Sequence, residues 1–370
     1  LCRRPSHKSF LNMLDIKVIR ENPALVQQRL QLRGGEHWKL IDDVLACDER
    51  RRAAETEKQA LQSQRKQLAQ QIGMLKKKGE DSAELEHQAR TVNAKIEALD
   101  AESDLAAARQ QDLLLHIPNL THEACPVGDD ESANPIVRVW GEKPDLEAPR
   151  DHVELAGLHG LISWDDATRI AGAGFAVYRG LGARLERALI QFLLDTQSDN
   201  GYEEVNVPHV VKRECMEGTG QLPKFEDDMY GTDPGEDGQN HLFLAPTAEV
   251  PVTNLYRDQL LPEAALPVKM VAYTPCFRRE AGSAGRDNKG IIRMHQFDKV
   301  ELVQIVHPDD GFAALEALTS HAELILQKLG LHYRVIELCT GDIGFSSSKT
   351  YDIEVWACLL YTSPSPRDRG

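Results

Sequence analysis

Closely spaced cysteines are missing from this sequence. Seven cysteines are spread over 370 residues without a single Cys-x-x-Cys pair. This spacing argues against a zinc site made of neighbouring thiolates and fits the reducing cytoplasm. No apolar run approaches the roughly 20 residues that a membrane-spanning helix needs, and residues 1–12 lack the apolar core of a secretion signal. We therefore expect a cytoplasmic protein with no membrane partner.

Two common nucleotide-binding motifs and an excess of basic residues are missing as well. The chain has neither a Gly-x-Gly-x-x-Gly pattern nor a P-loop pattern, which excludes Rossmann and P-loop sites at the level of motifs. A formal net charge of −15 argues against a surface that binds nucleic acid over its whole extent. That charge leaves room for a local basic patch.

Apolar residues recur every seven positions in the N-terminal third of the chain. Between Leu40 and Lys78 there is no proline and a single glycine, and after the short turn at 76–82 the same spacing resumes. Two such segments around a glycine turn predict an antiparallel helical hairpin with arms about 55 Å long. The repeating positions are Ala54, Leu61, Leu68 and Leu75 in the first segment, and Leu85, Val92, Leu99, Ala106 and Leu113 in the second.

Five basic residues lie toward the end of the first helical segment: Arg65, Lys66, Lys76, Lys77 and Lys78. Cations are favoured at a helix C-terminus in any case, so a solvated helix end explains them. A tip that contacts the phosphates of a nucleic acid explains them equally well. No aromatic residue interleaves these charges, so contact with the backbone is favoured over base stacking. The residues alone leave both interpretations open.

The remainder of the chain predicts an antiparallel α+β domain joined to the hairpin by a linker. Residues 118–150 are rich in Pro, Asp and Asn and show little periodicity, which is typical of a linker. A strand over 202–211 contains Pro208 and should therefore lie at a sheet edge or pair irregularly. Strands joined by hairpins, with helices between them, indicate the α+β class. We expect further strands within 241–256, 269–280, 291–306, 332–339 and 351–356, and helices over 180–199 and 313–329.

Arginine and glutamate residues cluster around these predicted strands. Arg278 at a strand end offers a planar fork to a carboxylate or a phosphate. Glu249 and Glu301 would present negative charge to an ammonium group, so the set suits a zwitterionic amino acid. Each Arg–Glu combination is also compatible with an ordinary surface ion pair.

A loop at 281–290 separates two of the strands and carries Arg286 and Lys289, with Arg293 beyond it. Such a loop is suited to closing over a polyphosphate. Phe297 alternates onto the same face as His295 and would stack a flat ring, although a place in the core explains it too.

Taken in order, several segments resemble the bacterial-type seryl-tRNA synthetases, which are class II aminoacyl-tRNA synthetases, over about residues 13–356. FRREAGSAGRDNKGIIRMHQFDKVELV resembles the second signature motif of that family, and LAPTAEVPVTN resembles its serine-binding segment. GYEEVNVPHVV resembles the first, dimer-forming motif, and CTGDIGF with KTYDIEVW resembles the strands before the last active-site segment. The family binds tRNA with a long N-terminal coiled-coil arm, in agreement with the predicted hairpin.

The resemblance implies a role for each candidate residue. Arg278 would bridge the α-phosphate of ATP and the carboxylate of serine. Glu280 would contact the adenine side of ATP, and Phe297 would stack on the adenine ring. Mg²⁺ is expected to accompany ATP, but we assign it no protein ligand in this sequence. The loop at 281–290 would fold over ATP and the end of the tRNA.

For the amino acid, the resemblance implies that Thr247, Glu249 and Glu301 hold the amino and hydroxyl groups of serine. Seryl-adenylate would form first, and the seryl group would then pass to tRNA(Ser) on a homodimer. The basic residues of the arm, from Arg65 to Lys78, would contact the tRNA. Members of the family usually also charge tRNA(Sec) with serine, and the sequence leaves open whether this chain does so.

The end of the sequence departs from the family pattern. After Trp356 it reads ACLLYTSPSPRDRG, where the family continues with metal-binding residues and a third motif. We expect a C-terminally truncated chain in which residues 1–12 and 357–370 are foreign or extra, and which is inactive for lack of the third motif. The expected domains are then an arm at 13–117, a linker at 118–150 and a partial catalytic domain at 151–356.

Two other functions stay open at this point. One is a synthetase-like ligase that charges a carrier protein, and the long arm argues against it. The other is a non-catalytic tRNA-binding or coiled-coil interaction protein.

Overall fold

The chain divides into two compact units in the computed structural model, with the boundary between Thr121 and His122. The structure describes residues 14–236, 238–281, 290–357 and 361–362. Within this part of the chain no helix is both long enough and apolar enough to cross a membrane.

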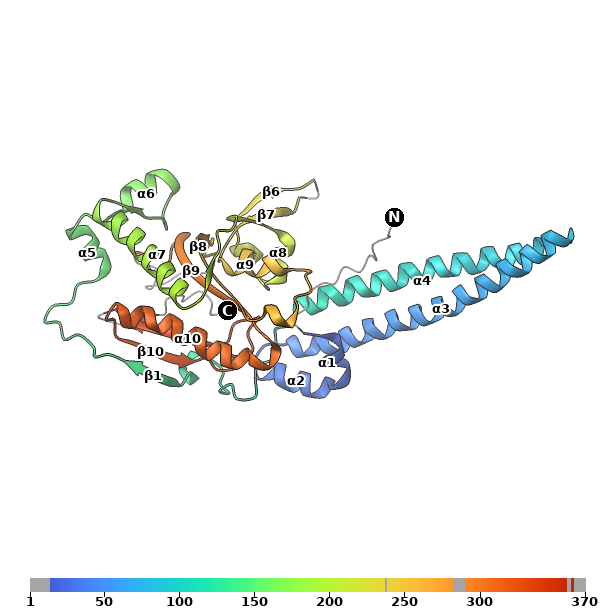
Figure 1. The fold of residues 1–370 in the computed structure, drawn as a ribbon, viewed down its shortest axis with the longest axis horizontal. Helices are drawn as coiled ribbons and strands as arrows, with labels where there is room; N and C mark the ends of the chain where they lie inside the picture. Colours follow the sequence, from blue (N-terminus) through green and yellow to red (C-terminus); the bar gives the residue numbers. More distant parts are fainter. Residues whose placement is uncertain (1–13, 237, 282–289, 358–360, 363–370) are drawn as a thin grey trace. The chain divides into compact units, whose positions relative to one another are not determined.

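The N-terminal unit is a helical hairpin with two short helices at its base (Figure 1). The turn between the long helices uses Gly79, whose φ of 74° is left-handed and therefore suits glycine. This conformation lets the Glu80 N–H donate to the carbonyl of Leu75 at 3.0 Å. The hairpin predicted from the heptads is confirmed. The helices are α1 (Ile16–Glu21), α2 (Pro23–Gln31), α3 (Leu40–Lys78) and α4 (Ala83–Leu115).

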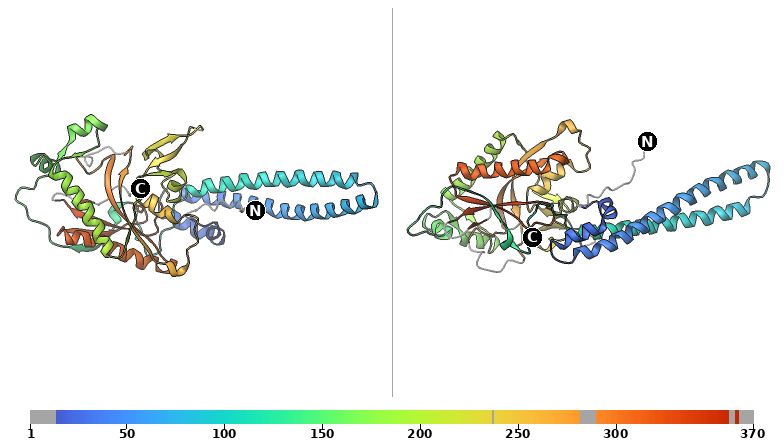
Figure 2. Two further views of the ribbon diagram at one scale, coloured as in Figure 1. Left: turned by 45° about the horizontal axis from the view of Figure 1, so that its top comes forward. Right: turned by 90° about the horizontal axis from the view of Figure 1, so that it is seen from below.

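The predicted heptad positions form the seam between α3 and α4, which run side by side in every view (Figure 2). Leu68, Val92 and Ile96 are buried together, with Leu61 and Leu85 partly buried against them. At the base, α1 and α2 add a cluster that the heptads did not predict. Its members include Ile19, Val26, Leu30, Ile41, Val44 and Ile117.

The C-terminal unit is built around the antiparallel pair β8 (Val268–Phe277) and β9 (Gln296–Ile305). The two strands pair without a break from Val268 with Ile305 to Phe277 with Gln296. This confirms the predicted pair of strands around a loop. The unit also contains α5 (His152–Leu158), α6 (Trp164–Ala171), α7 (Leu181–Asp199), α8 (Arg213–Gly218), α9 (Glu249–Thr253) and α10 (Gly311–Lys328).

In the part of the chain that the structure describes, three further sheets are present, and the smallest pairs β2 with β3. The largest has the order β1-β10-β11-β12, and a second has the order β5-β7-β6. β4 (Glu203–Glu204) joins the edge of β8 in parallel. The remaining strands are β1 (Ile136–Trp140), β2 (Ile162–Ser163), β3 (Val177–Tyr178), β5 (Val210–Lys212), β6 (Gly231–Pro234), β7 (Asn240–Leu244), β10 (Tyr333–Glu337), β11 (Tyr351–Trp356) and β12 (Tyr361–Thr362).

The prediction of one strand over 202–211 was wrong. β4 and β5 belong to different sheets, and Pro208 lies between them where no ladder donor is needed. The prediction of a strand through 241–256 was also wrong in its second half, because α9 begins at Glu249. Pro251 is tolerated there because the N–H groups of a first helical turn have no partner within the helix.

Regular structure also occurs within 118–150, where the sequence showed little periodicity. β1 pairs antiparallel with β10, and a register shift between Ile136 and Arg138 interrupts the ladder. The partner strand lies almost 200 residues further along the chain, so no local sequence pattern predicts this pairing.

Helix α7 packs against β8 and β9 on the face that carries Tyr273 and Asp298. The Tyr273 hydroxyl donates to Asp298 Oδ1 at 2.6 Å. Burial, together with a hydrogen bond to Asp298 and repulsion from it, raises the pKa of Glu186 on α7 to about 7. Burial and the nearby carboxylates Glu186 and Asp298 likewise raise the pKa of Tyr178 to about 12.

The raised pKa of Glu186 predicts a loss of stability with increasing pH. The unfolded chain releases this proton near 4.5 and the folded chain near 7. The protonated carboxyl therefore stabilises the fold below the lower value, and this contribution is lost as the pH rises through the higher one. Glu186→Gln, which stays neutral, should unfold at a higher temperature than the parent at about pH 8 and at a similar temperature at about pH 5.

Thermal unfolding at both pH values measures this difference, with Glu142→Gln at an exposed position as the control. A Glu186→Gln effect of the same size at both pH values would contradict the prediction.

Candidate active site

The predicted site residues gather on the face of the β8–β9 pair opposite to Tyr273. Cross-strand partners in an antiparallel pair point to the same side of the sheet. The residues that β8 contributes to this face are small and fully buried, while β9 contributes longer polar and aromatic side chains. The pairs are Ala272 with Glu301, Thr274 with Lys299, and Cys276 with Phe297.

Arg278 lies immediately after the last residue of β8 and is held from several directions. Its backbone N–H donates to the carbonyl of His295 at 3.0 Å, and its Nε donates to the carbonyl of Pro246 at 3.3 Å. Its Cζ lies 5.6 Å from the centre of the Phe297 ring. The residue is only 7% exposed. The guanidinium is therefore positioned before any ligand arrives.

Thr247 and Glu301 meet directly, although 54 residues separate them in the sequence. The Thr247 hydroxyl donates to Glu301 Oε2 at 2.8 Å, and Thr247 Oγ1 accepts the Glu249 N–H at 3.1 Å. Lys299 Nζ lies 2.5 Å from the same Glu301 oxygen. The structure thus brings a hydroxyl, a carboxylate and an ammonium together at one end of the site.

Glu280 contacts Arg293 across the loop. Glu280 has a φ of 52°, and its Oε2 accepts from Arg293 Nη1 at 3.2 Å. This ion pair holds the two ends of the loop together. Arg286 and Lys289, which were expected to reach a polyphosphate, lie outside the described residues.

The start of the loop is anchored to the 3-10 helix Glu226–Asp228. The Arg279 N–H donates to the carbonyl of Asp228 at 2.8 Å, and the Ala281 N–H donates to Asp228 Oδ1 at 2.8 Å. Asp228 was not predicted, because it lies some 50 residues before the loop it supports.

His295 and Gly174 form a support that sequence reasoning also missed. The His295 N–H donates to the carbonyl of Gly174 at 2.8 Å. A Cβ on Gly174 would lie 2.4 Å from His295 Cδ2, and its φ of 82° is left-handed. Glycine is therefore required at this position. His295 in turn places the start of β9 beside Arg278.

The buried Cys276 thiol is not a nucleophile at this site. Burial raises its pKa above the ordinary value, so the thiol stays protonated near neutral pH. Among the described residues no group of three or more His, Cys, Asp or Glu side chains is arranged to hold a metal ion.

The five basic residues of the arm do not form one cluster. Lys66 precedes Lys76 by ten positions on α3, which is about 15 Å along a helix. Lys76 Nζ lies 2.8 Å from Glu86 Oε1 on α4, and this contact lowers the pKa of Glu86. Lys77 and Lys78 are exposed in the last turn of α3.

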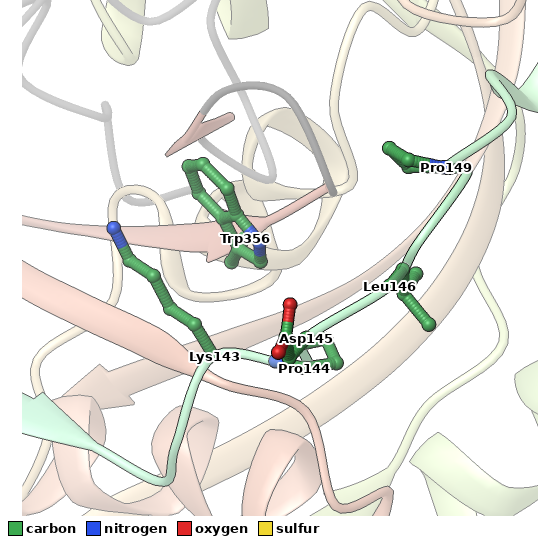
Figure 3. A pocket seen from close by; sticks show the side chains of 6 residues that line it. All are labelled: Lys143, Pro144, Asp145, Leu146, Pro149 and Trp356. Atoms are coloured by element: carbon green, nitrogen blue, oxygen red, sulfur yellow. The ribbon is translucent and has the colours of Figure 1, made fainter.

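A cavity of about 280 Å³ lies between the segment that contains Lys143 and Pro149 and the side chain of Trp356 (Figure 3). Among its lining residues, Lys143 Nζ lies 4.2 Å from the centre of the Trp356 ring. None of the predicted binding or catalytic residues lines it. Its lining is Lys143, Pro144, Asp145, Leu146, Pro149 and Trp356.

Comparison with protein families identifies the class of this fold and site. Residues 230–362 match the model of the tRNA synthetase class II core domain (G, H, P, S and T). Residues 13–121 match the seryl-tRNA synthetase N-terminal domain. The antiparallel sheet with its arginine and the helical hairpin thus correspond to two parts of a class II aminoacyl-tRNA synthetase.

Individual relatives show to which family of class II aminoacyl-tRNA synthetases the chain belongs. A serine–tRNA ligase of Akkermansia muciniphila is 68% identical over 346 residues, which are 93% of this chain and 80% of that protein. A serine–tRNA ligase of Thiobacillus denitrificans is 50% identical over the same shares. The chain belongs to the seryl-tRNA synthetase family.

Solved structures agree with this assignment. The crystal structure of seryl-tRNA synthetase from Pyrococcus horikoshii complexed with ATP has a TM-score of 0.87 and 35% identity, over 95% of this chain and 83% of that one. A serine–tRNA ligase from Naegleria fowleri has a TM-score of 0.82 at 24% identity, over 95% of this chain and 84% of that one. The second likeness supports the fold alone.

Proposed function

We propose that this chain is built to activate L-serine with ATP and to transfer the seryl group to tRNA(Ser). The observation that carries the proposal is the layout of one sheet face. Arg278 and Phe297 lie at one end of this face, and Thr247 and Glu301 are hydrogen-bonded at the other. Family membership supports the reaction, and this layout would suit the two halves of an aminoacyl-adenylate.

The Arg278 end fits ATP. A guanidinium is the side chain best matched to phosphate oxygens because its planar fork donates two parallel hydrogen bonds. Phe297 offers a ring face for the adenine beside that guanidinium. Glu280, held by Arg293, would meet the adenine from the loop side. The relative from Pyrococcus horikoshii was crystallised with ATP, which supports this placement.

The Thr247 end fits serine. The carboxylate of Glu301 would accept hydrogen bonds from the serine ammonium, and the Thr247 hydroxyl already lies beside it. Glu249 begins α9 next to this pair and would add a second negative charge. The serine carboxylate would then point along the sheet toward Arg278.

Positioning would provide most of the rate acceleration. A serine carboxylate oxygen attacks the α-phosphorus, the bond to the bridging oxygen breaks, and pyrophosphate leaves. Arg278 would neutralise both the attacking carboxylate and the α-phosphate, and it is already fixed by backbone contacts. The terminal ribose hydroxyl of the tRNA then takes the seryl group. Mg²⁺ would neutralise the leaving pyrophosphate, and we assign it no ligand among the described residues.

Arg278→Ala should lower serine-dependent ATP–pyrophosphate exchange by about 100- to 1000-fold, because one preorganised donor to the developing charge is removed. The assay uses a chain extended to the full length of the curated relatives, which this chain matches over four fifths. Arg169→Ala, at an exposed helix position, is the matched control and should keep parent activity. Exchange by Arg278→Ala within about threefold of the parent would refute the assignment.

The hairpin is proposed to bind tRNA through phosphate contacts at its tip. Lys77 and Lys78 are the strongest candidates, because Lys76 is paired with Glu86. Arg65 and Lys66 are exposed further down α3 and would meet a different part of the same RNA.

Replacing Lys77 and Lys78 together with Ala should weaken tRNA charging and leave pyrophosphate exchange unchanged, because serine and ATP bind in the other unit. The salt dependence of tRNA binding should flatten, with the slope falling by about 0.7 to 0.9 per lost phosphate contact. Lys328→Ala at the end of α10 is the control. Equal losses in charging and exchange would show that the tip acts through stability alone.

The enzyme is proposed to be a homodimer that uses α7 and the segment 202–211. Leu181 and Leu185 are 67% and 55% exposed on α7, whereas Thr196 near its end is buried within the unit. The helix is thus covered near its C-terminal end and leaves two leucines open near its N-terminal end. An open apolar stripe of this kind suits the same stripe on a second copy.

Replacing Leu181 and Leu185 together with Glu should convert the dimer to a monomer at micromolar concentration, because four carboxylates would face each other at the interface. Sedimentation of the full-length protein measures the mass. Leu260→Glu, at a fully exposed position, should leave the dimer intact. A monomeric parent would contradict the proposal.

A further inference from the structure

Lys299 lies on the same strand face as Phe297 and Glu301, between them. Side chains two residues apart on a strand share a face and are about 6.6 Å apart. If Phe297 marks the adenine and Glu301 marks the serine ammonium, the residue between them lies under the junction of the two substrates. That junction is where the serine carboxylate meets the α-phosphate.

The ammonium of Lys299 is engaged elsewhere in the absence of substrates. Its Nζ is 2.5 Å from Glu301 Oε2, the oxygen that also accepts the Thr247 hydroxyl. The side chains of Lys299 and Glu301 are only 20% and 22% exposed, so water screens the pair incompletely. Lys299 thus occupies the position that the serine ammonium needs.

Two ammonium groups cannot share one carboxylate oxygen without repelling each other. When serine arrives, Lys299 would therefore have to leave Glu301, and the serine carboxylate and the α-phosphate would bring new negative charge to the strand face between Phe297 and Glu301. A lysine head on a flexible four-carbon stem can make this move, which a shorter or planar side chain cannot make as freely.

We propose that Lys299 is a catalytic residue that exchanges Glu301 for the reacting carboxylate and α-phosphate when serine binds. This inference rests on the proposed function. The Lys299 ammonium donates hydrogen bonds and transfers no proton, while the carboxylate oxygen bonds to the α-phosphorus and pyrophosphate leaves. Together with Arg278 just after the end of β8, it would bring a second cation to the junction, this one from β9. The exchange also keeps Glu301 neutralised before and after serine binds.

Lys299→Met tests the proposal because it keeps most of the stem and removes the charge. Pyrophosphate exchange in the full-length protein should show a kcat lower by about 100-fold, with the KM for serine within about threefold of the parent. Lys299→Arg should recover part of the kcat because it restores a cation. Lys328→Met, the same change at an exposed position, should match the parent.

The split between kcat and KM separates this role from a structural one. If Lys299 merely holds Glu301 in place, its loss raises the KM for serine and leaves kcat unchanged, and that result would overturn the proposal. A kcat within about threefold of the parent would overturn it as well. Thermal unfolding checks that each variant is folded, and Lys299→Gln replaces Lys299→Met if the latter is not.

The activity of the parent enzyme distinguishes a failure of this inference from a failure of the proposed function on which it rests. A full-length parent without serine-dependent exchange would refute the proposed function. An active parent with an equally active Lys299→Met variant would refute only the role of Lys299.

Discussion

The unbroken pairing of β8 with β9 is the constraint on which the site depends. Because side chains alternate between the two faces of a strand, a slip of one residue would send Phe297, Lys299 and Glu301 to the α7 side and bring Asp298 to the site. The continuous register from Val268 to Phe277 excludes such a slip. It also leaves Arg278 at the strand end beside Phe297.

Charge within the site is balanced before any substrate is present. Glu301 is neutralised by Lys299 and Glu280 by Arg293, while Arg278 is held by a backbone carbonyl. Buried or half-buried charges are costly unless they are paired, which accounts for the ion pairs at Glu301 and Glu280. Under the proposed function, binding would be an exchange of ion pairs at fixed positions.

The two units are stabilised by different kinds of contact. The hairpin is stabilised by a seam of small apolar clusters and by local capping at Gly79, so its form follows from a short repeating pattern. The sheet unit relies on contacts between distant segments, such as Thr247 with Glu301 and Tyr273 with Asp298.

The sequence by itself determined the hairpin, the β8–β9 pair with its loop, and the identity of most candidate site residues, because heptads, strand alternation and glycine turns are local signals. It also singled out Thr247, Arg278, Phe297 and Glu301. Only the tertiary structure decided that 202–211 is split between two sheets, that α9 replaces a predicted strand, and that β1 pairs with β10. Only the structure showed that Lys299 lies on Glu301, that Asp228 anchors the loop and that Gly174 supports His295. These features depend on partners tens to hundreds of residues away, and local periodicity carries no information about which distant segment a side chain will meet.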